Sequence, residues 1–237
     1  MKNFFISILL ILFPNLLFSQ EIDFIEYDLD NGMHVILHRD ASVPLVVTSV
    51  MYHVGAKDED PERTGFAHFF EHLLFEGTKN IPKGEFMKIV ERNGGSLNAN
   101  TSNDRTYYYE FFPSNKLELG LWLESERLMH PVIDQKGVET QNEVVKEEKR
   151  LGVDNSPYGH LFEQILQSLF KKHPYRWTTI GSMDHLDAAT LEEFQEFNKK
   201  FYVPNNGVLV VAGNFEIEET KKMVEDYFGP IPRGNDV

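Results

Sequence analysis

An apolar stretch that contains two histidines and a glutamate constrains this chain most. Residues 64–78 read TGFAHFFEHLLFEGT. If residues 65–76 are helical, His68 and His72 stand four residues apart on one face, close enough to share one cation. Glu71 lies beside that face, where a general base can reach a water on the metal without being a ligand. Phe and Leu side chains make this helix apolar nearly all round, so we expect it to be buried, and its polar side chains then need partners.

A zinc site with two histidines needs at least one more protein ligand and an open position for water. The chain has no Cys, so the best remaining candidates are acids. A strongly helical stretch at residues 139–150, ETQNEVVKEEKR, supplies several. It could equally be a solvated charged helix, because Glu and Lys are common helix formers.

Helical spacing favours Glu148 among these acids. It lies three or four residues from apolar positions that we expect to form the buried face, namely Val144, Val145 and Leu151. The positions that we expect to face water are Glu143, Lys146 and Lys149. This arrangement supports Glu148 over its neighbour Glu147 as the third ligand.

Together these residues resemble the family of pitrilysin, insulin-degrading enzyme and mitochondrial processing peptidase. That family has an inverted His-x-x-Glu-His motif and, some 76 residues later, a glutamate that follows two valines, as Glu148 does here. The resemblance implies one zinc ion held by His68, His72 and Glu148, with Glu71 as the general base on zinc-bound water. The family often carries a further glutamate, involved in catalysis, seven positions before the ligand, and this chain has Gln141 there.

Residues 94–101 (GGSLNANT) and 104–108 (DRTYY) resemble the strand pair that lies beside the zinc in this family. The resemblance implies an exposed edge strand to which the substrate adds its own backbone, with Asn98 and Ala99 in contact with the peptide. Main-chain pairing of this kind accepts many sequences and leaves selectivity to side-chain pockets. Asn98 could equally be an ordinary turn or sheet-edge residue.

The remaining pattern predicts an α+β fold, a mainly antiparallel sheet with helices packed on it, as in the processing-peptidase-like unit. Strands are expected at 24–29, 33–38, 45–54, 96–101, 105–112 and 208–212, and helices at 82–91, 114–129, 134–151, 158–171, 191–201 and 217–228. Thr64 and Gly77 are expected to bound the metal helix. On helix 114–129 we expect Glu118, Glu124 and Glu126 to face water, and helix 158–171 to bury its apolar side.

The first twenty residues predict a secretory signal peptide, with Lys2 as their only charged side chain and an apolar run from Phe4 to Phe18. We therefore expect residues 21–237 to form a zinc-binding peptidase domain in a bacterial periplasm or outside the cell, or anchored to a membrane if the signal is not cleaved. The formal charge of −14 argues against nucleic acid as a partner, because the chain has no basic stripe for phosphates.

Members of the resembling family are built from two or four such units, so the chain is expected to be the first half of a two-unit enzyme. A second, homologous unit would come from the same polypeptide or from a partner chain. The sequence thus predicts a zinc-dependent endopeptidase that hydrolyses peptides or unfolded protein segments. The alternatives are a non-catalytic peptide-binding or scaffold subunit of a paired peptidase, and a hydrolase of another substrate.

Overall fold

A six-stranded sheet forms the centre of the molecule in the computed structural model, which describes residues 22–237. Its strands are β1 (Ile25–Asp28), β2 (His34–Arg39), β3 (Leu45–Tyr52), β4 (Ser96–Thr101), β5 (Thr106–Pro113) and β6 (Gly207–Gly213). They lie in the order β1-β2-β6-β3-β5-β4. Strands β2 and β6 pair in parallel and all other neighbours pair antiparallel. The predicted α+β class with a mainly antiparallel sheet is confirmed.

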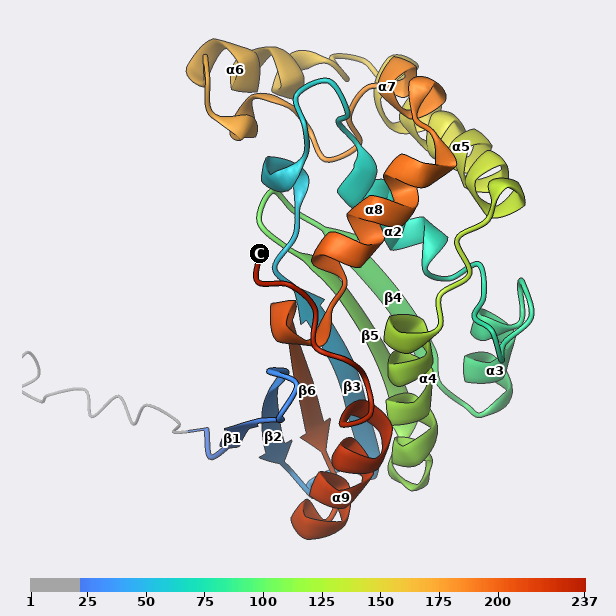
Figure 1. Ribbon diagram of the computed structural model, residues 1–237, viewed down its shortest axis with the longest axis vertical. Helices are drawn as coiled ribbons and strands as arrows, with labels where there is room; N and C mark the ends of the chain where they lie inside the picture. Colours follow the sequence, from blue (N-terminus) through green and yellow to red (C-terminus); the bar gives the residue numbers. More distant parts are fainter. Residues whose placement is uncertain (1–21) are drawn as a thin grey trace, which may run out of the picture.

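Helices cover one face of the sheet and form one end of the molecule (Figure 1). They are α2 (Phe66–Leu73), α3 (Phe86–Arg92), α4 (Leu117–Met129), α5 (Gln135–Lys149), α6 (Leu161–Leu169), α7 (Met183–Ala188), α8 (Leu191–Phe201) and α9 (Ile217–Phe228). Short helical turns lie at η1 (Ala56–Asp58), η2 (Ser114–Lys116), η3 (Arg150–Asp154), η4 (Pro174–Arg176) and η5 (Pro204–Asn206). Helix α7 was not predicted, and within residues 22–237 no helix is long and apolar enough to cross a membrane. The predicted signal peptide lies outside the described residues.

Strand β4 forms one edge of the sheet, because its only neighbour among the described strands is β5. Its alternation places Ala99, which is buried, on the face toward α2, and Asn98, which is exposed, on the opposite face. The predicted edge strand is therefore present. Helices α5, α6 and α7 lie at the end of the molecule beyond α2, at the top of Figure 1.

The predicted boundaries of the metal helix were wrong at both ends. Gly65, with a φ of +99°, is the N-cap of α2, whereas the Thr64 hydroxyl accepts a hydrogen bond from the Ser182 backbone N–H at 3.1 Å. The helix ends at Leu73. The Leu74 N–H still bonds four residues back to Phe70, whereas those of Phe75 and Glu76 bond three residues back, as in a tighter turn. Gly77, with a φ of +152°, lies beyond the helix.

The predicted orientation was also wrong for some side chains on two helices. On α4, Glu124 and Glu126 are buried rather than solvent-facing, because each finds polar partners inside the protein. In the stretch predicted as helix 134–151, Val145 is buried as predicted, but Val144 on α5 and Leu151 in η3 are 43 % and 63 % exposed. Helix α6 leaves most of its apolar side chains exposed (Leu161, Phe162, Ile165 and Leu169).

Candidate metal and catalytic site

Helix α2 carries the predicted histidines and is buried against α8 as its apolar sequence requires. Phe66 and Phe69 stack on Phe194 with ring centroids 4.6 and 4.7 Å apart, and Phe70 stacks on Phe197 at 5.3 Å. The Phe70 carbonyl also accepts a hydrogen bond from the Tyr108 hydroxyl of β5 at 2.9 Å. These contacts fix the rotation of α2 about its own axis. The two histidines and Glu71 lie on the edge of the helix that does not pack against these aromatic rings.

The structure brings His68, His72 and Glu148 together from α2 and α5. His68 Nε2 lies 3.5 Å from Glu148 Oε1, and His72 Nε2 lies 3.2 Å from Glu148 Oε2. One ligand atom from each of the three residues lies within 4.8 Å of the others. Tetrahedral zinc with ligands at about 2.1 Å places neighbouring ligand atoms ~3.4 Å apart, so the nitrogen-to-oxygen distances fit a shared zinc ion.

The electrostatics of this group also suit a cation. Hydrogen bonds from His68 and His72 hold the pKa of Glu148 well below its usual range, so the carboxylate stays ionised. Glu147, the alternative third ligand, pairs instead with Arg150 on the outside of α5, 2.5 Å from Oε2 to Nη1. Among the residues described, no other group of three His, Asp or Glu side chains is placed to hold a metal.

Glu71 is half-buried beside the two histidines, and it has a fixed orientation. Its Oε2 accepts a hydrogen bond of 2.7 Å from the hydroxyl of Thr101, at the end of β4. A hydrogen bond to one carboxylate oxygen leaves the other available to a water molecule. Of the predicted substrate contacts, Ala99 is buried, and Asn98 is exposed with its Oδ1 accepting a bond from the Ala99 N–H at 2.9 Å.

A buried carboxylate that the sequence analysis missed caps the metal helix. Glu59 is 6 % exposed, and its two oxygens accept hydrogen bonds from the N–H groups of Gly65 and Ala67 at 2.9 and 2.8 Å. Because Gly65 has no side chain, Glu59 supplies the cap from the preceding loop. Burial raises the pKa of Glu59 to about 8, against the lowering effect of these two donors.

Gln141 stands where the resemblance would have placed a glutamate. Its side chain contacts Glu76, an acid that follows the end of α2. Its Nε2 donates to Oε1 of Glu76 at 2.5 Å, and the other oxygen of Glu76 pairs with Lys83. The alternation of β4 could have predicted that Thr101 shares the inner face with Ala99. No local sequence pattern predicts this role of Glu59, because it lies six residues before Gly65, the N-cap residue of α2.

Comparison with known proteins agrees with the fold. Residues 34–182 match the model of the insulinase family (peptidase family M16), and residues 188–236 match that of the peptidase M16 inactive domain. The zinc protease PqqE of Helicobacter pylori is 35 % identical over 206 residues, which cover 84 % of this chain and 45 % of that protein. An uncharacterized zinc protease of Mycobacterium leprae is 31 % identical over 201 residues, covering 85 % of this chain and 45 % of that protein.

Solved structures show the same relationship. A protease from Helicobacter pylori superposes with a TM-score of 0.88 at 31 % identity, over 91 % of this chain and 52 % of that one. The periplasmic protease PqqL from Escherichia coli gives a TM-score of 0.82 at 25 % identity, over 92 % of this chain and 26 % of that one. The chain thus spans about half the length of the curated relatives that it matches. On this evidence the chain belongs to the insulinase family of zinc proteases, peptidase family M16.

Proposed function

We propose that this chain is the zinc-binding, catalytic unit of an endopeptidase that hydrolyses peptides or unfolded protein segments. The observation that supports this most directly is the placement of Glu71 beside the group of His68, His72 and Glu148, with Thr101 orienting its carboxylate. One zinc ion held by those three side chains would act as a Lewis acid and lower the pKa of water at the site.

The residues of this chain would then move the proton and hold the substrate. Glu71 takes the proton from the attacking water and returns it to the amine of the leaving peptide. The free edge of β4 pairs with the extended backbone of the substrate, which places Asn98 and Ala99 next to it. Hydrogen bonds along the backbone align the scissile carbonyl with the water that Glu71 activates.

A second unit completes the enzyme in this proposal, in the same polypeptide or as a partner chain. The relatives are about twice as long as the region that this chain matches, and this supports a second unit. The second unit would provide donors for the tetrahedral oxyanion, and a missing donor of this type costs about a hundred-fold or more in rate. We therefore expect the chain alone to bind zinc but to cleave peptides poorly.

We further propose that the protein is exported. The apolar run near the N-terminus supports this, and its structural neighbour PqqL is a periplasmic protease.

Metal content tests the site. We expect about one zinc per wild-type chain after dialysis, a strong loss in Glu148→Gln and no loss in the matched control Glu147→Gln, whose side chain pairs with Arg150. Glu71→Gln should keep its zinc and lose peptide cleavage in the presence of the second unit. Equal zinc in the Glu148→Gln and wild-type chains would remove Glu148 from the site. Peptide binding without cleavage by the zinc-loaded, two-unit protein would favour the non-catalytic scaffold, which has no physical need for Glu71.

A further inference from the structure

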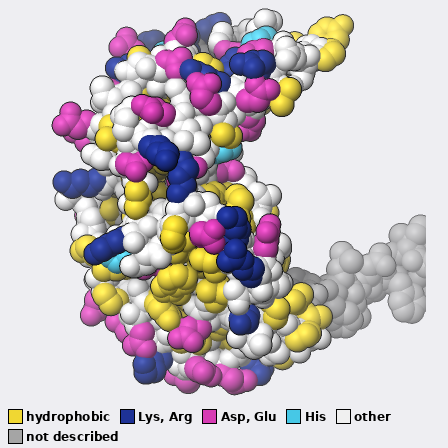
Figure 2. Space-filling model, turned by 90° about the vertical axis from the view of Figure 1, so that its right-hand side faces the viewer, with side chains coloured by type: hydrophobic (Ala, Val, Ile, Leu, Met, Phe, Trp, Pro, Cys, Tyr) yellow, Lys and Arg dark blue, Asp and Glu magenta, His cyan; other side chains and the backbone are white. Residues whose placement is uncertain are grey.

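Helix α5 carries the proposed third metal ligand although little of the helix is buried. Its buried residues are Gly137, Val138 and Val145, and Glu148 follows the last of them by three positions. Figure 2 shows a hollow on one side of the molecule, with histidine in its wall, and the Glu148 side chain is 48 % exposed. Because few apolar contacts hold this end of α5, its position depends on polar contacts with other elements.

The contacts that reach this part of α5 from another element come from α7. The ion pairs at the end of α5 are local and join α5 and η3 only to themselves (Lys149 with Asp154, Glu147 with Arg150). Asp187 of α7, in contrast, binds two side chains of α5. Its Oδ1 accepts a hydrogen bond from Asn142 Nδ2 at 2.7 Å and lies 2.5 Å from Lys146 Nζ. These contacts hold α5 from the side of α7.

A strap, residues 174–188, carries Asp187 past the start of the metal helix. It consists of η4, the loop that follows and α7. Gly181 has a φ of +65°, and a Cβ atom added to it would lie 2.3 Å from the backbone nitrogen of Gly65, the N-cap of α2. Only glycine allows the two backbones to approach so closely. The strap therefore lies directly against the N-terminal end of α2.

Side chains bind α7 to the same end of α2. His185 Nδ1 accepts a hydrogen bond from the Thr64 backbone N–H at 3.2 Å and lies 2.9 Å from the Thr64 hydroxyl. The Ser182 N–H donates to this hydroxyl at 3.1 Å, and Leu186 anchors α7 in the hydrophobic core. Helix α7 thus connects the start of α2 with α5, the two helices that carry the proposed metal ligands.

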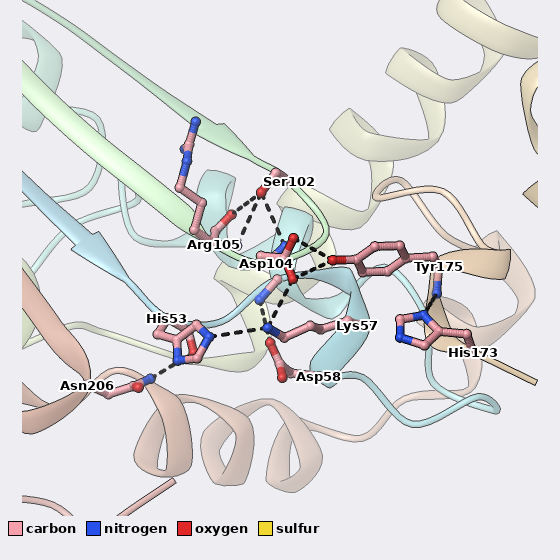
Figure 3. A network of polar contacts seen from close by, with 10 residues as sticks. His53, Lys57, Asp58, Ser102, Asp104, Arg105, His173, Tyr175 and Asn206 are labelled. Atoms are coloured by element: carbon pink, nitrogen blue, oxygen red, sulfur yellow. Dashed lines mark hydrogen bonds and ion pairs between the residues drawn. The ribbon is translucent and has the colours of Figure 1, made fainter.

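The other end of the strap is fixed by the network shown in Figure 3. The Tyr175 hydroxyl lies 2.8 and 2.7 Å from the two oxygens of Asp104, in the turn after β4. Lys57 Nζ pairs with the same carboxylate at 3.0 Å. Between Tyr175 and α7, the Trp177 indole N–H donates to the Ala56 carbonyl at 2.7 Å. This bond holds the part of the strap that leads to α7 even when the Tyr175 contact is lost.

We propose that Asp187 and His185 are positioning residues for the metal site, because the strap holds α5 against α2 and so keeps Glu148 at the ion that the two histidines share. The inference rests on the zinc site of the function proposed above. Ligands on two elements bind one ion tightly only when the elements are held at the correct separation. Without the Asp187 contacts, the end of α5 gains conformational freedom that zinc binding then has to remove.

The zinc affinity of the full chain, measured by competition with a chelating dye, tests this independently of cleavage. We expect Asp187→Ala to weaken zinc binding about ten-fold, and Asp187→Asn, which keeps an accepting oxygen, to recover most of the loss. His185→Ala should also weaken binding, and His185→Asn should recover it because the amide oxygen can replace Nδ1. The matched control is Asp184→Ala, on the same helix, where the side chain is exposed and has no ion pair among residues 22–237; it should bind zinc as the wild type does.

A double variant and urea unfolding separate positioning from a merely structural role. Lys146→Met should weaken zinc binding as Asp187→Ala does, and the double variant should bind no more weakly, because both changes break one contact. A structural role alone would lower the free energy of unfolding of the metal-free chain and leave its zinc affinity unchanged. Wild-type zinc affinity in Asp187→Ala, or an equal loss in Asp184→Ala, would overturn the inference.

The outcomes also separate this inference from the proposed function. Tyr175→Phe should keep the wild-type zinc affinity, because the Trp177 bond remains. A wild-type chain that binds no zinc would refute both the metal site and its positioning by α7. Zinc binding that depends on Asp187, together with no peptide cleavage by the two-unit protein, would support the role of the strap and refute the peptidase.

Discussion

Arg127 of α4 is fully buried, and its replacement should destabilise the fold severely. Its guanidinium nitrogens lie 2.7 Å from Glu124 and 3.0 Å from Glu110 of β5, and none of the three side chains is exposed. Three aromatic rings surround the guanidinium with centroids 4.5 to 4.7 Å away, those of Phe75, Phe86 and Tyr108. The cluster joins α4 to β5, and Tyr108 in turn donates a hydrogen bond to the metal helix.

The expected cost of Arg127→Met follows from the charge that it leaves behind. Burial raises the pKa of Glu124 well above its ordinary value, and the Arg127 guanidinium opposes this shift. Methionine removes the cation that lies between the two buried carboxyl groups, so the acids lose the partner that compensates for their burial. Breaking a buried pair in this way costs about 3–5 kcal/mol in the free energy of unfolding, which for a domain of this size lowers Tm by roughly 6–20 °C.

Urea and thermal unfolding measure this cost. Arg92→Met is the matched control, because its side chain is 66 % exposed and 3.4 Å from Glu85; we expect it to cost less than about 1 kcal/mol. Glu124→Gln should also cost much less than Arg127→Met, because it leaves the pair of Arg127 with Glu110 in place. The reasoning fails if Arg127→Met costs less than about 1 kcal/mol, or if Glu124→Gln destabilises as strongly.

Three further predictions concern the site and its surroundings. Thr101→Val should lower kcat roughly ten-fold at unchanged zinc content, because Glu71 loses the hydrogen bond that orients it; Thr101→Ser should restore the rate, and an equal loss in both variants would contradict this role. Because the pKa of Glu59 rises from 4.5 to about 8 on folding, the folded protein keeps a proton that the unfolded chain releases in this interval. The free energy of unfolding should therefore fall with rising pH, by up to about 1.4 kcal/mol per pH unit from this group. Glu59→Gln should flatten the slope measured from pH 5 to 9, and identical slopes would refute the assignment. Tyr175→Phe removes the hydroxyl that contacts both oxygens of Asp104 and should speed amide hydrogen exchange in residues 161–176 without changing zinc content; unchanged exchange would mean that other contacts hold α6.

The parts of the site that sequence could predict depend on local periodicity. Four-residue spacing in a helix was enough to place His68 and His72 on one edge of α2. The edge position of β4 was implied by the family resemblance, and the inward orientation of Ala99 was not predicted. The third member, Glu148, was named from its helical face and from the family resemblance. The structure does bring Glu148 close to the two histidines. The face of α5 that carries Glu148 is partly exposed, however, and not buried as predicted.

The parts that sequence could not predict depend on partners far away in the chain. Lys146 was expected to face water, yet it pairs with Asp187 of α7, a helix that the pattern did not reveal. Glu126 is buried because Thr78 and Asn80 donate to its two oxygens at 2.9 Å each. From sequence alone, a charged residue on a helix is predicted to face solvent. The partners that bury these two residues lie some 40 residues or more away along the chain, so no local pattern indicates them.

A contact between α5 and the segment after α2 explains why residue 141 departs from the family pattern. The glutamate that resembling proteins often carry seven positions before the third ligand is Gln141 here, and its amide donates to Glu76 at 2.5 Å. A carboxylate at position 141 would face the carboxylate of Glu76, and two acids at hydrogen-bond distance cannot both ionise without a large cost. Glutamine satisfies Glu76 as a neutral donor, while Lys83 balances its charge. Since an amide exchanges no proton at neutral pH, any acid–base role at this corner would fall to Glu76 rather than to residue 141.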